Sequence, residues 1–557
     1  KMANRHQEAR ALHFKDGDAW LAYQEKYGTY NEAGFHEILK NHTHRMSTEV
    51  AMMQNLGSNP RYTFESLLDE AKIKLKADPQ NGLKHGEIDK HAHRAMSMYN
   101  TLDANTRAID STLGNVMGGL RALMVASKLG GTTLTTFGDH ASMKKVANML
   151  GLSYTKSILP EYIKQLKQGA TRDEALRFGL GINEMAGSMT RFGDADIVSS
   201  ATKSGRFNSR MQAFAAMTMK LSGLNAVTAG AKRALNLVHM NKLAEMTRKT
   251  DWKDLGTDDL KILQGNGITE RDWQLWQQLE PSKREDGTAV LTQNDFFNVP
   301  DDVIKHFLPL DKQDNPNALA DFRYKAAMKY QTHIFNEESV AIIEAGVRER
   351  SIINLGEAGT IQGELGRTLF QFKGFPLAYM FRIGHRAFAQ GDIKSRVTFL
   401  ASLLAYQTLA GALIVQTQNL ANGKNPEPVF TIDFFGKSLL KGGGLSFLGD
   451  IMSALSDPTG RSASDFISGP LLGQSMKLGM LLTGMGNNII EGKESTRMME
   501  VANTLKSNIP LQNLWYSKLV VDRMLYSKLQ NMIDPDYLPR TQQRLENLGN
   551  NYWWDLS

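Results

Sequence analysis

Apolar residues recur every three or four positions along most of this chain, which is the spacing of one face of an α-helix. The segment around Thr218 shows the pattern clearly. Its recurring apolar positions are Met211, Phe214, Met217, Leu221 and Leu224. No long alternation of apolar and polar residues, which would indicate strands, occurs. The pattern predicts an all-α protein, multi-domain and elongated, with irregular Gly/Pro-rich connectors.

Prolines mark where the helices are interrupted. None occurs between Pro160 and Pro281, or between Pro316 and Pro376. Long helices are permitted there, because a proline inside a helix costs about 3 kcal/mol or more. Residues 281–317 are rich in proline and predict an irregular connector between helical regions.

Local turn and cap signals refine this picture. The tripeptide Glu285-Asp286-Gly287 predicts a small hairpin in the connector, and any strand is expected to be confined to short pieces within Glu280–Asp314. Two helix starts are expected at Thr257 and Thr269. Each hydroxyl can accept a hydrogen bond from the backbone three residues further on.

The breaks divide the chain into six consecutive regions. They are 1–110, charged, His-rich and helical; 111–280, a central helical domain; 281–317, the connector; 318–395, helical with an aromatic and basic segment; 396–495, apolar and Gly-rich; and 496–557, an amphipathic tail. The fifth region is the candidate for membrane activity. It includes a second apolar stretch, Phe466–Gly486, whose Lys477 and glycines make it a poorer spanning segment that could be re-entrant or interfacial.

The strongest single signal is the uncharged run Val397–Thr417. Its 21 residues match the roughly 20 mostly apolar residues that a membrane-spanning helix needs. Just before it, Leu369–Phe388 interleaves aromatic residues with cations, as at a membrane boundary. The alternative is a buried helix in a large helical core, since Ser402 and Gln407 dilute the apolarity. The candidate membrane-contact residues are Phe370, Phe372, Phe375, Tyr379, Phe381, Val397, Leu404, Leu409 and Leu413.

Composition narrows the class of protein only slightly. The net charge of +7 is a mild excess for 557 residues, compatible with nucleic acid or anionic lipid but specific to neither. Cysteine is absent, which excludes disulfides, thiolate metal sites and cysteine nucleophiles. The first residue is lysine rather than methionine, so we expect the chain to be part of a longer protein.

No constellation of residues points to catalysis or to a cofactor. The pairs His42/His44 and His91/His93 could ligate zinc from a strand, but in a helix such residues diverge by about 200°. Glu184 and Glu364 resemble catalytic glutamates only loosely, and the glycine clusters lack a Walker lysine. We expect no enzyme, metal site or cofactor within these residues.

Basic residues recur beside apolar segments. They are Arg107, Arg121, Lys128, Lys220, Lys232, Arg233, Lys394 and Arg396. They would lie on solvated helix faces, or form a basic stripe for phosphate backbones or anionic headgroups.

Several phrases resemble the C-terminal part of the large internal virion, or ejection, proteins of short-tailed bacteriophages. The phrases are RALMVASKLGGTTLTTFGDHA (Arg121–Ala141), GITERDWQLWQQL (Gly267–Leu279), GTIQGELGRTLFQFKGFPLAY (Gly359–Tyr379), the tail Pro510–Glu546 and the terminal Asn551-Tyr552-Trp553-Trp554. The likeness covers roughly residues 110–557, and its most specific parts are Gly359–Tyr379 and the tail.

The resemblance implies a structural component of a trans-envelope conduit for genome delivery. The expected partners are further copies of the chain, other ejection, portal or tail proteins, double-stranded phage DNA bound without sequence preference, and the host inner membrane. The expected location is the virion interior and, after infection, the host periplasm and inner membrane. The alternative is a capsid-interior scaffold that anchors an upstream enzyme, a transglycosylase or a virion RNA polymerase, to the portal core.

The tail supplies a second set of candidates. Apolar residues from Leu514 to Met532 approximate one face of an amphipathic helix, with Lys518, Arg523 and Lys528 towards the other side. Large aromatics near a chain end are candidates for docking onto a neighbouring subunit or another virion protein. They are Trp515, Tyr552, Trp553 and Trp554, and the alternative is that they pack onto the chain's own core.

Overall fold

In the computed structural model, the described residues are 13–27, 43, 46–78, 80–104, 112–167, 169–180, 203–353, 359–388, 392–442, 509–547 and 551–553. Helices dominate them, and the all-α prediction is confirmed. Their sole sheet is the antiparallel pair β1 (Ser282–Lys283) and β2 (Ala289–Val290). It is closed by a turn in which Gly287 has a positive φ of 82°. The hairpin predicted at Glu285-Asp286-Gly287 is therefore present.

The chain divides into two units, each assembled from separate stretches, whereas the sequence analysis divided it into consecutive regions. Unit 1 comprises Lys1–Asn115, Ala195–Gly205 and Gly346–Arg367. Its helices are α1 (Gly17–Tyr27), α3 (Pro60–Ala77), α4 (His85–Ala104), α16 (Val347–Ile353) and most of α17 (Ile361–Leu369). In it α3 packs on α4 through the stacked rings of Phe64 and Tyr99, whose centroids are 4.9 Å apart.

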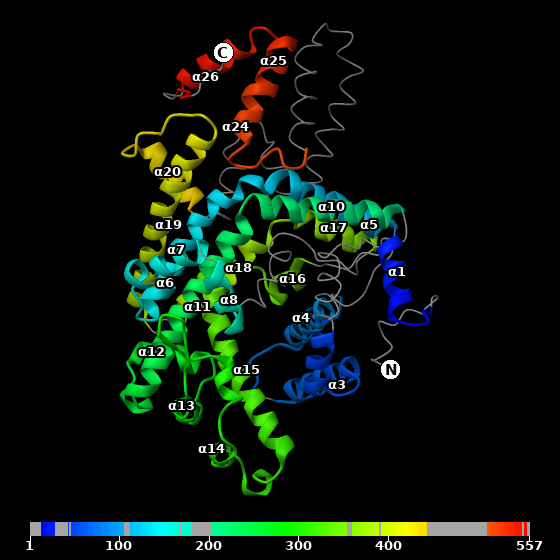
Figure 1. Ribbon diagram of the computed structural model, residues 1–557, viewed down its shortest axis with the longest axis vertical. Coiled ribbons are helices and arrows are strands. Elements are labelled where there is room, and N and C mark those ends of the chain that lie inside the picture. The colour runs from blue at the N-terminus through cyan, green and yellow to red at the C-terminus, as the bar shows by residue number, and fades with distance from the viewer. Residues whose placement is uncertain are drawn as a thin grey trace. The chain divides into compact units, whose positions relative to one another are not determined.

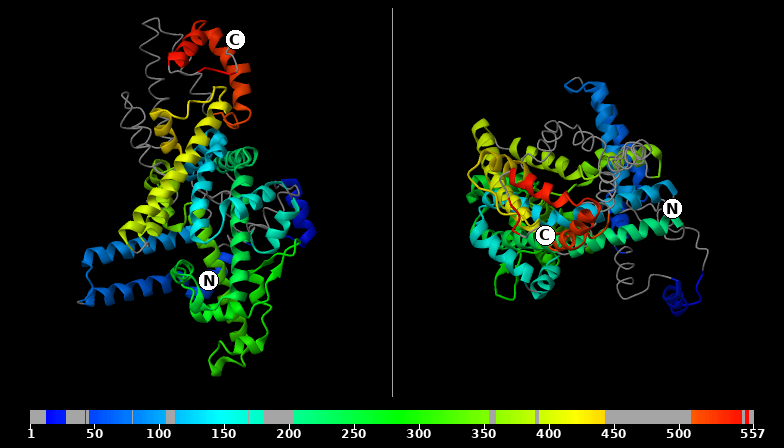
Figure 2. Two further views of the ribbon diagram at one scale, coloured as in Figure 1. Left: turned by 90° about the vertical axis from the view of Figure 1, so that its left-hand side faces the viewer. Right: turned by 90° about the horizontal axis from the view of Figure 1, so that it is seen from above.

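Unit 2 comprises Val116–Asp194, Arg206–Ala345 and Thr368–Ser557. Among its described residues, the helices are most of α5 (Thr112–Lys128), α6 (Phe137–Met149), α7 (Leu159–Lys167), α8 (Gly169–Arg177), most of α10 (Lys203–Leu221), α11 (Leu224–Lys249), α12 (Thr257–Gly265), α13 (Glu270–Gln277), α14 (Asp301–Lys305), α15 (Pro316–Ala341), α18 (Gly374–Phe388), α19 (Ile393–Ala421), α20 (Ile432–Lys441), α24 (Lys518–Val521), α25 (Lys528–Ile533) and α26 (Tyr537–Asn547). Figures 1 and 2 show α19 running beside α6 and α20.

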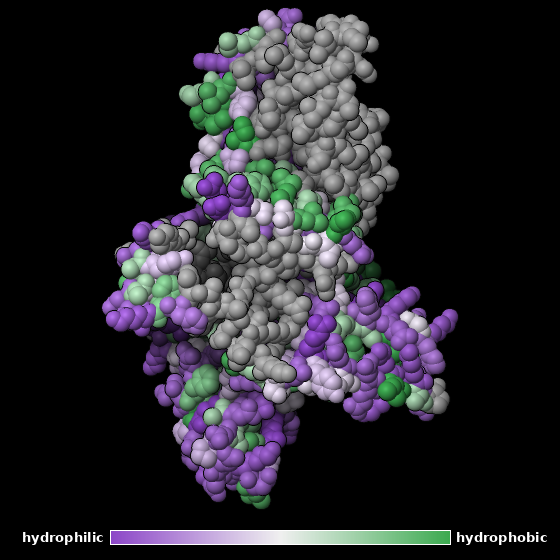
Figure 3. All heavy atoms as spheres, turned by 90° about the vertical axis from the view of Figure 1, so that its right-hand side faces the viewer, coloured by the Kyte–Doolittle hydropathy of each residue, from purple (hydrophilic) through white to green (hydrophobic). Residues whose placement is uncertain are grey.

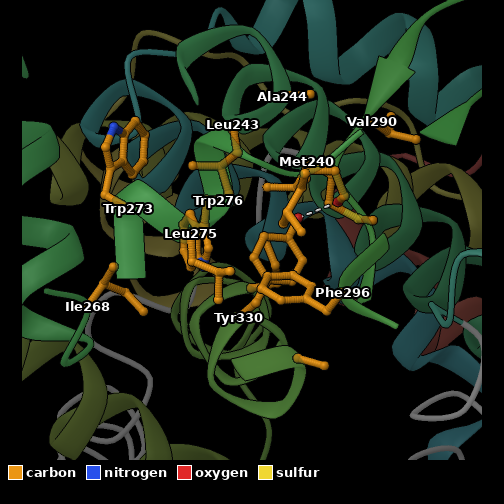
Figure 4. Packing of buried hydrophobic residues seen from close by; sticks show 14 of the residues in the cluster. Met240, Leu243, Ala244, Ile268, Trp273, Leu275, Trp276, Val290, Phe296 and Tyr330 are labelled. Atoms are coloured by element: carbon orange, nitrogen blue, oxygen red, sulfur yellow. Dashed lines mark hydrogen bonds between the residues drawn. The ribbon is translucent and has the colours of Figure 1, made fainter. Parts of the chain in front are cut away.

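The largest hydrophobic core of unit 2 lies between α11, α13 and α15 (Figure 4). Trp276 and Tyr330 meet edge to face at 5.1 Å, and the hydroxyl of Tyr330 donates to the carbonyl of Leu291. Leu291 and Phe296 come from the proline-rich region that the sequence analysis treated as an irregular connector, yet both are fully buried. That region also contains β1, β2 and α14, so its apolar residues complete this core.

The two predicted helix caps have different outcomes. At α13, the Thr269 hydroxyl accepts from the backbone of Asp272, whose carboxylate accepts from the backbone of Thr269, which confirms the prediction. At α12 the prediction is wrong, because the N-cap residue is Gly256 and Thr257 is already inside the helix. The acidic Asp258 and Asp259 in its first turn still complement the helix dipole.

The described part of the tail is mainly helical from Lys518 to Asn547, but its apolar residues do not share one side. Leu514 and Leu519 are buried, whereas Met524 and Met532 are exposed. Met524 lies within the π-helical turn Asp522–Ser527, and Met532 follows that turn. Such a turn takes up an additional residue and rotates the following side chains around the axis. The continuous amphipathic face predicted from the sequence is therefore broken at this turn.

Candidate functional site

Helix α19 contains the apolar run that stands out in the sequence. It starts at Asp392, whose carboxylate accepts from the Ser395 backbone N–H at 3.1 Å. Its 29 residues correspond to a length of about 43 Å at 1.5 Å per residue. Among the described residues it is the one helix that is long and apolar enough to cross a membrane, by length and composition. Its most apolar window has a mean hydropathy of 1.7, and 33% of that window is buried.

One side of α19 is covered by α20 through a direct backbone contact. A Cβ atom placed on Gly411 would lie 1.8 Å from the carbonyl oxygen of Ser438, and one placed on Gly442 would lie 1.8 Å from that of Gln407. The two pairs show that α19 and α20 run antiparallel, as a helical hairpin. Small residues permit this close approach in membrane helices as well as in soluble ones.

A second side of α19 is covered by α6 and α18. The Lys145 ammonium donates to the Ser402 hydroxyl at 2.6 Å and lies 4.6 Å from the centre of the Phe399 ring. Burial lowers the pKa of Lys145. From α18, the Tyr379 hydroxyl accepts a hydrogen bond from the Gln407 amide at 2.5 Å. Burial raises the pKa of Tyr379 to about 12, so this phenol stays protonated at neutral pH. Ser402 and Gln407 thus point towards neighbouring helices, whereas Thr398 of the same run is exposed.

The parts of α19 that its neighbours leave uncovered form an exposed apolar surface that winds around the helix, because at about 3.6 residues per turn Leu404 lies on roughly the opposite side from Leu413. Its large exposed residues are Ile393, Val397, Leu400, Leu404, Leu409, Leu413 and Leu420. Leu409 is the most exposed of the predicted contact residues, at 66%. Four members of the predicted set, Val397, Leu404, Leu409 and Leu413, therefore lie on this surface.

The predicted aromatic candidates lie elsewhere. Phe375 and Tyr379 pack against the core cluster that includes Phe399 of α19. Phe372 packs against the core cluster formed by α5 and α10. Phe370 and Phe381 are half-buried, and Lys373 lies 5.3 Å from the ring of Phe370. Three of the five rings, those of Phe372, Phe375 and Tyr379, therefore pack against core clusters of the protein rather than lying on its surface.

The docking candidates that the structure describes contact their own chain. The Trp515 indole donates to the carbonyl of Ser222 at 3.1 Å. The Trp553 indole donates to the carbonyl of Leu420 at 3.1 Å, and Tyr552 forms an isolated bridge with Lys424. Trp554 lies outside the described residues, as does the second apolar stretch, 466–486.

Three of the basic candidates, Arg121, Lys232 and Arg233, are buried rather than solvated, and the Arg121 guanidinium donates to the Thr368 hydroxyl at 3.5 Å. Lys232 of α11 forms ion pairs with Glu344 at 2.8 Å and with Glu338 at 3.3 Å. The neighbouring Arg233 donates to the Gln165 side chain at 2.9 Å. Burial raises the pKa of Glu338. The sequence analysis offered a solvated helix face or a basic stripe for these residues. Both interpretations are wrong at these positions, because each cation has a partner inside the protein.

The sequence analysis missed a pair of buried histidines. His239 of α11 and His333 of α15 meet edge to face, with ring centroids 5.1 Å apart, beside a cavity of about 10 Å³ that Lys242 and Asp259 also line. Within the described residues, neither ring nitrogen of His333 has a hydrogen-bond partner. Burial lowers the pKa of His333 to about 4 and that of His239 well below its usual value. The apolar spacing along each helix could have shown that both histidines face inward. It could not have shown that the two rings meet, because they come from different helices.

The other sequence candidates occupy ordinary positions. His91 and His93 are exposed on α4, and His42 and His44 lie outside the described residues, as does Glu184. Glu364 is buried, accepts from the Gly359 backbone at 2.8 Å and pairs with Arg367 at 3.2 Å, so it holds the start of α17. In the described part of the chain, no three His, Asp or Glu residues are grouped to hold a metal ion.

Comparison with models of protein families, with curated proteins and with solved structures finds no match to this chain. The geometry of α19 and its neighbours is therefore the basis for the functional argument.

Proposed function

We propose that this chain is a structural component of a phage ejection apparatus, a conduit across the host envelope, and that α19 is its membrane-contacting helix. The observation that carries the proposal is the exposed apolar surface of a 29-residue helix of spanning length. The resemblance of Gly359–Tyr379 and of the tail to internal virion proteins supports the same function. In this proposal the protein acts as an oligomer with other ejection, portal or tail proteins, and passes from the virion to the host periplasm and inner membrane.

The division of the α19 surface into covered and exposed parts suits such a protein. The covered side contains Gln407 and Gly411, which bind α18 and α20. The exposed part presents Leu404 and Leu409 to the medium that surrounds the helix. A bilayer would remove that apolar surface from water, a gain of about 25 cal/mol for each square ångström buried.

Dye leakage from lipid vesicles tests the proposal. Leu404→Arg puts a charge near the centre of α19, at a cost of about 2.5–3.5 kcal/mol for a spanning helix. We expect this variant to lose vesicle binding and leakage while keeping its helical circular dichroism. The matched control is Leu310→Arg, at a residue that is 86% exposed in the connection before α15. Equal leakage by folded Leu404→Arg and wild type would contradict the role of α19. A wild-type chain that neither binds nor permeabilises vesicles would favour the capsid-interior scaffold instead.

A further inference from the structure

The loop between α19 and α20, together with the start of α20, presents an apolar tip that the sequence analysis did not single out. The tip consists of Val429, Phe430, Ile432 and Phe435. Phe430 is fully exposed, and Ile432 is 93% exposed. Exposure of this degree is unusual for such side chains, and here four of them are close in sequence.

The backbone around the tip is held in place. The Glu427 N–H donates to the Gln416 side chain at 2.9 Å, and the Gln416 amide donates back to the Glu427 carbonyl at 2.6 Å. Beyond the loop, the Thr431 hydroxyl caps α20 by accepting from the Phe434 N–H at 3.2 Å. The apolar side chains are therefore presented by an anchored loop.

Residues from the C-terminal end of the chain join the same place. The backbone N–H of Trp553 donates to the Gly423 carbonyl at 2.9 Å, and the backbone N–H of Asn425 donates to the Asn551 carbonyl at 2.9 Å. The Arg523 guanidinium stacks 4.2 Å from the ring centre of Tyr552. Figure 1 shows the loop at the same end of α19 as α24 and α26.

The loop has the composition of a membrane interface, because it presents exposed aliphatic and Phe side chains while Trp553 and Tyr552 are bound at its start, with cations nearby. The Trp553 ring is about half exposed, and its N–H is already bonded to protein. The sequence analysis expected an aromatic boundary before α19, whereas these exposed aromatic residues follow it.

We infer that the tip, with Tyr552 and Trp553, is an interfacial lipid-binding surface, which enters the boundary between headgroups and acyl chains. The inference rests on the proposed function, in which the chain meets a bilayer. Acidic residues nearly balance the cations around the tip, because Lys437 pairs with both Glu427 and Asp433. Apolar insertion, more than headgroup charge, is therefore the expected source of affinity.

The absence of cysteine makes a direct test simple. Ile432→Cys labelled with an environment-sensitive nitrobenzoxadiazole dye should show a blue shift and a rise in emission when the full chain meets phosphatidylcholine vesicles. Lipids carrying a quencher near the headgroup should quench it. Leu310→Cys is the matched control, because this exposed leucine lies near the end formed by α14 and the start of α15, which is predominantly hydrophilic on the face shown in Figure 3. Its label should not respond.

A functional pair of variants completes the test. Phe430→Ser with Ile432→Ser should lower the vesicle partition coefficient at least tenfold, while Leu310→Ser leaves it unchanged. If the Leu404→Cys label responds to vesicles but the Ile432→Cys label does not, the membrane role of α19 stands and the tip inference fails. If no label responds, the proposed function fails first. A shift at Ile432→Cys that follows protein concentration without lipid would show a protein–protein surface and overturn the inference.

Discussion

Gly411 of α19 faces the carbonyl oxygen of Ser438 of α20 so closely that a Cβ atom at Gly411 would lie 1.8 Å from it. No side chain fits between these backbones. Gly411→Ala should therefore push the hairpin apart and destabilise the protein by about 1–3 kcal/mol, as overpacked sites do. Denaturant unfolding measures the change.

Gly436→Ala provides the matched control for that prediction. Gly436 lies in the same hairpin, and a Cβ there would meet nothing within 4 Å. Because alanine favours a helix over glycine by about 0.5–1 kcal/mol, this variant should be as stable as wild type or more so. Equal destabilisation by both substitutions would contradict the close-packed hairpin.

The buried histidines predict a loss of stability in mild acid. His333 has a pKa of about 4 in the folded protein, below its unfolded value near 6.5. A lowered pKa means that the unfolded chain binds the proton more readily. Stability is therefore fully present above pH 6.5 and is lost as the pH falls towards 4, by roughly 2–3 kcal/mol for this group alone. The other ionisable side chains around the two histidines are Lys242, Asp259, Glu337 and Arg386.

Thermal unfolding between pH 7 and 5 tests the histidine prediction in a window where most carboxylates remain charged. His333→Leu should reduce the pH dependence of the melting temperature. His91→Leu, at an exposed histidine, should leave it unchanged. A wild-type melting temperature that is constant over this window would contradict the assignment.

Arg284 joins the β1–β2 hairpin to helices α7 and α8. Its guanidinium pairs with Glu161 of α7 at 2.9 Å and with Glu174 of α8 at 3.0 Å, and all three side chains are buried. Arg284→Ala leaves two carboxylates buried without their cation, so we expect a loss of about 3–5 kcal/mol. The neighbouring Lys283 is exposed, and Lys283→Ala should change stability by less than about 0.5 kcal/mol. Similar losses from the two variants would contradict a specific role for the buried pair.

Removal of residues 550–557 tests whether the C-terminal end is bound within the chain. The Asn425 N–H would lose its acceptor, the Asn551 carbonyl, so its hydrogen exchange should become faster. The Lys424 N–H donates to the Asn419 carbonyl within the same turn and should keep its exchange rate. An unchanged rate at Asn425 would favour docking of the tail onto another subunit.

Features set by neighbours along the chain were predictable from the sequence. The Thr269 cap depends on Asp272 three residues away, and the β1–β2 turn depends on Gly287. The long apolar run was recognisable as one helix, and the structure gives it the bounds Ile393–Ala421. Helical hydrogen bonds join residues four apart, so local patterns carry most of the information for the fold class.

Pairings between distant segments were decided only by the tertiary structure. Lys232 can be buried because Glu338 and Glu344, more than a hundred residues later in the sequence, form ion pairs with it. Trp553 lies beside Gly423 for the same kind of reason. The sequence alone determined that helices form and which of their faces are apolar. Which apolar face is covered and which cation finds a carboxylate depended on packing, because the energy of a contact depends on distances in space rather than along the chain.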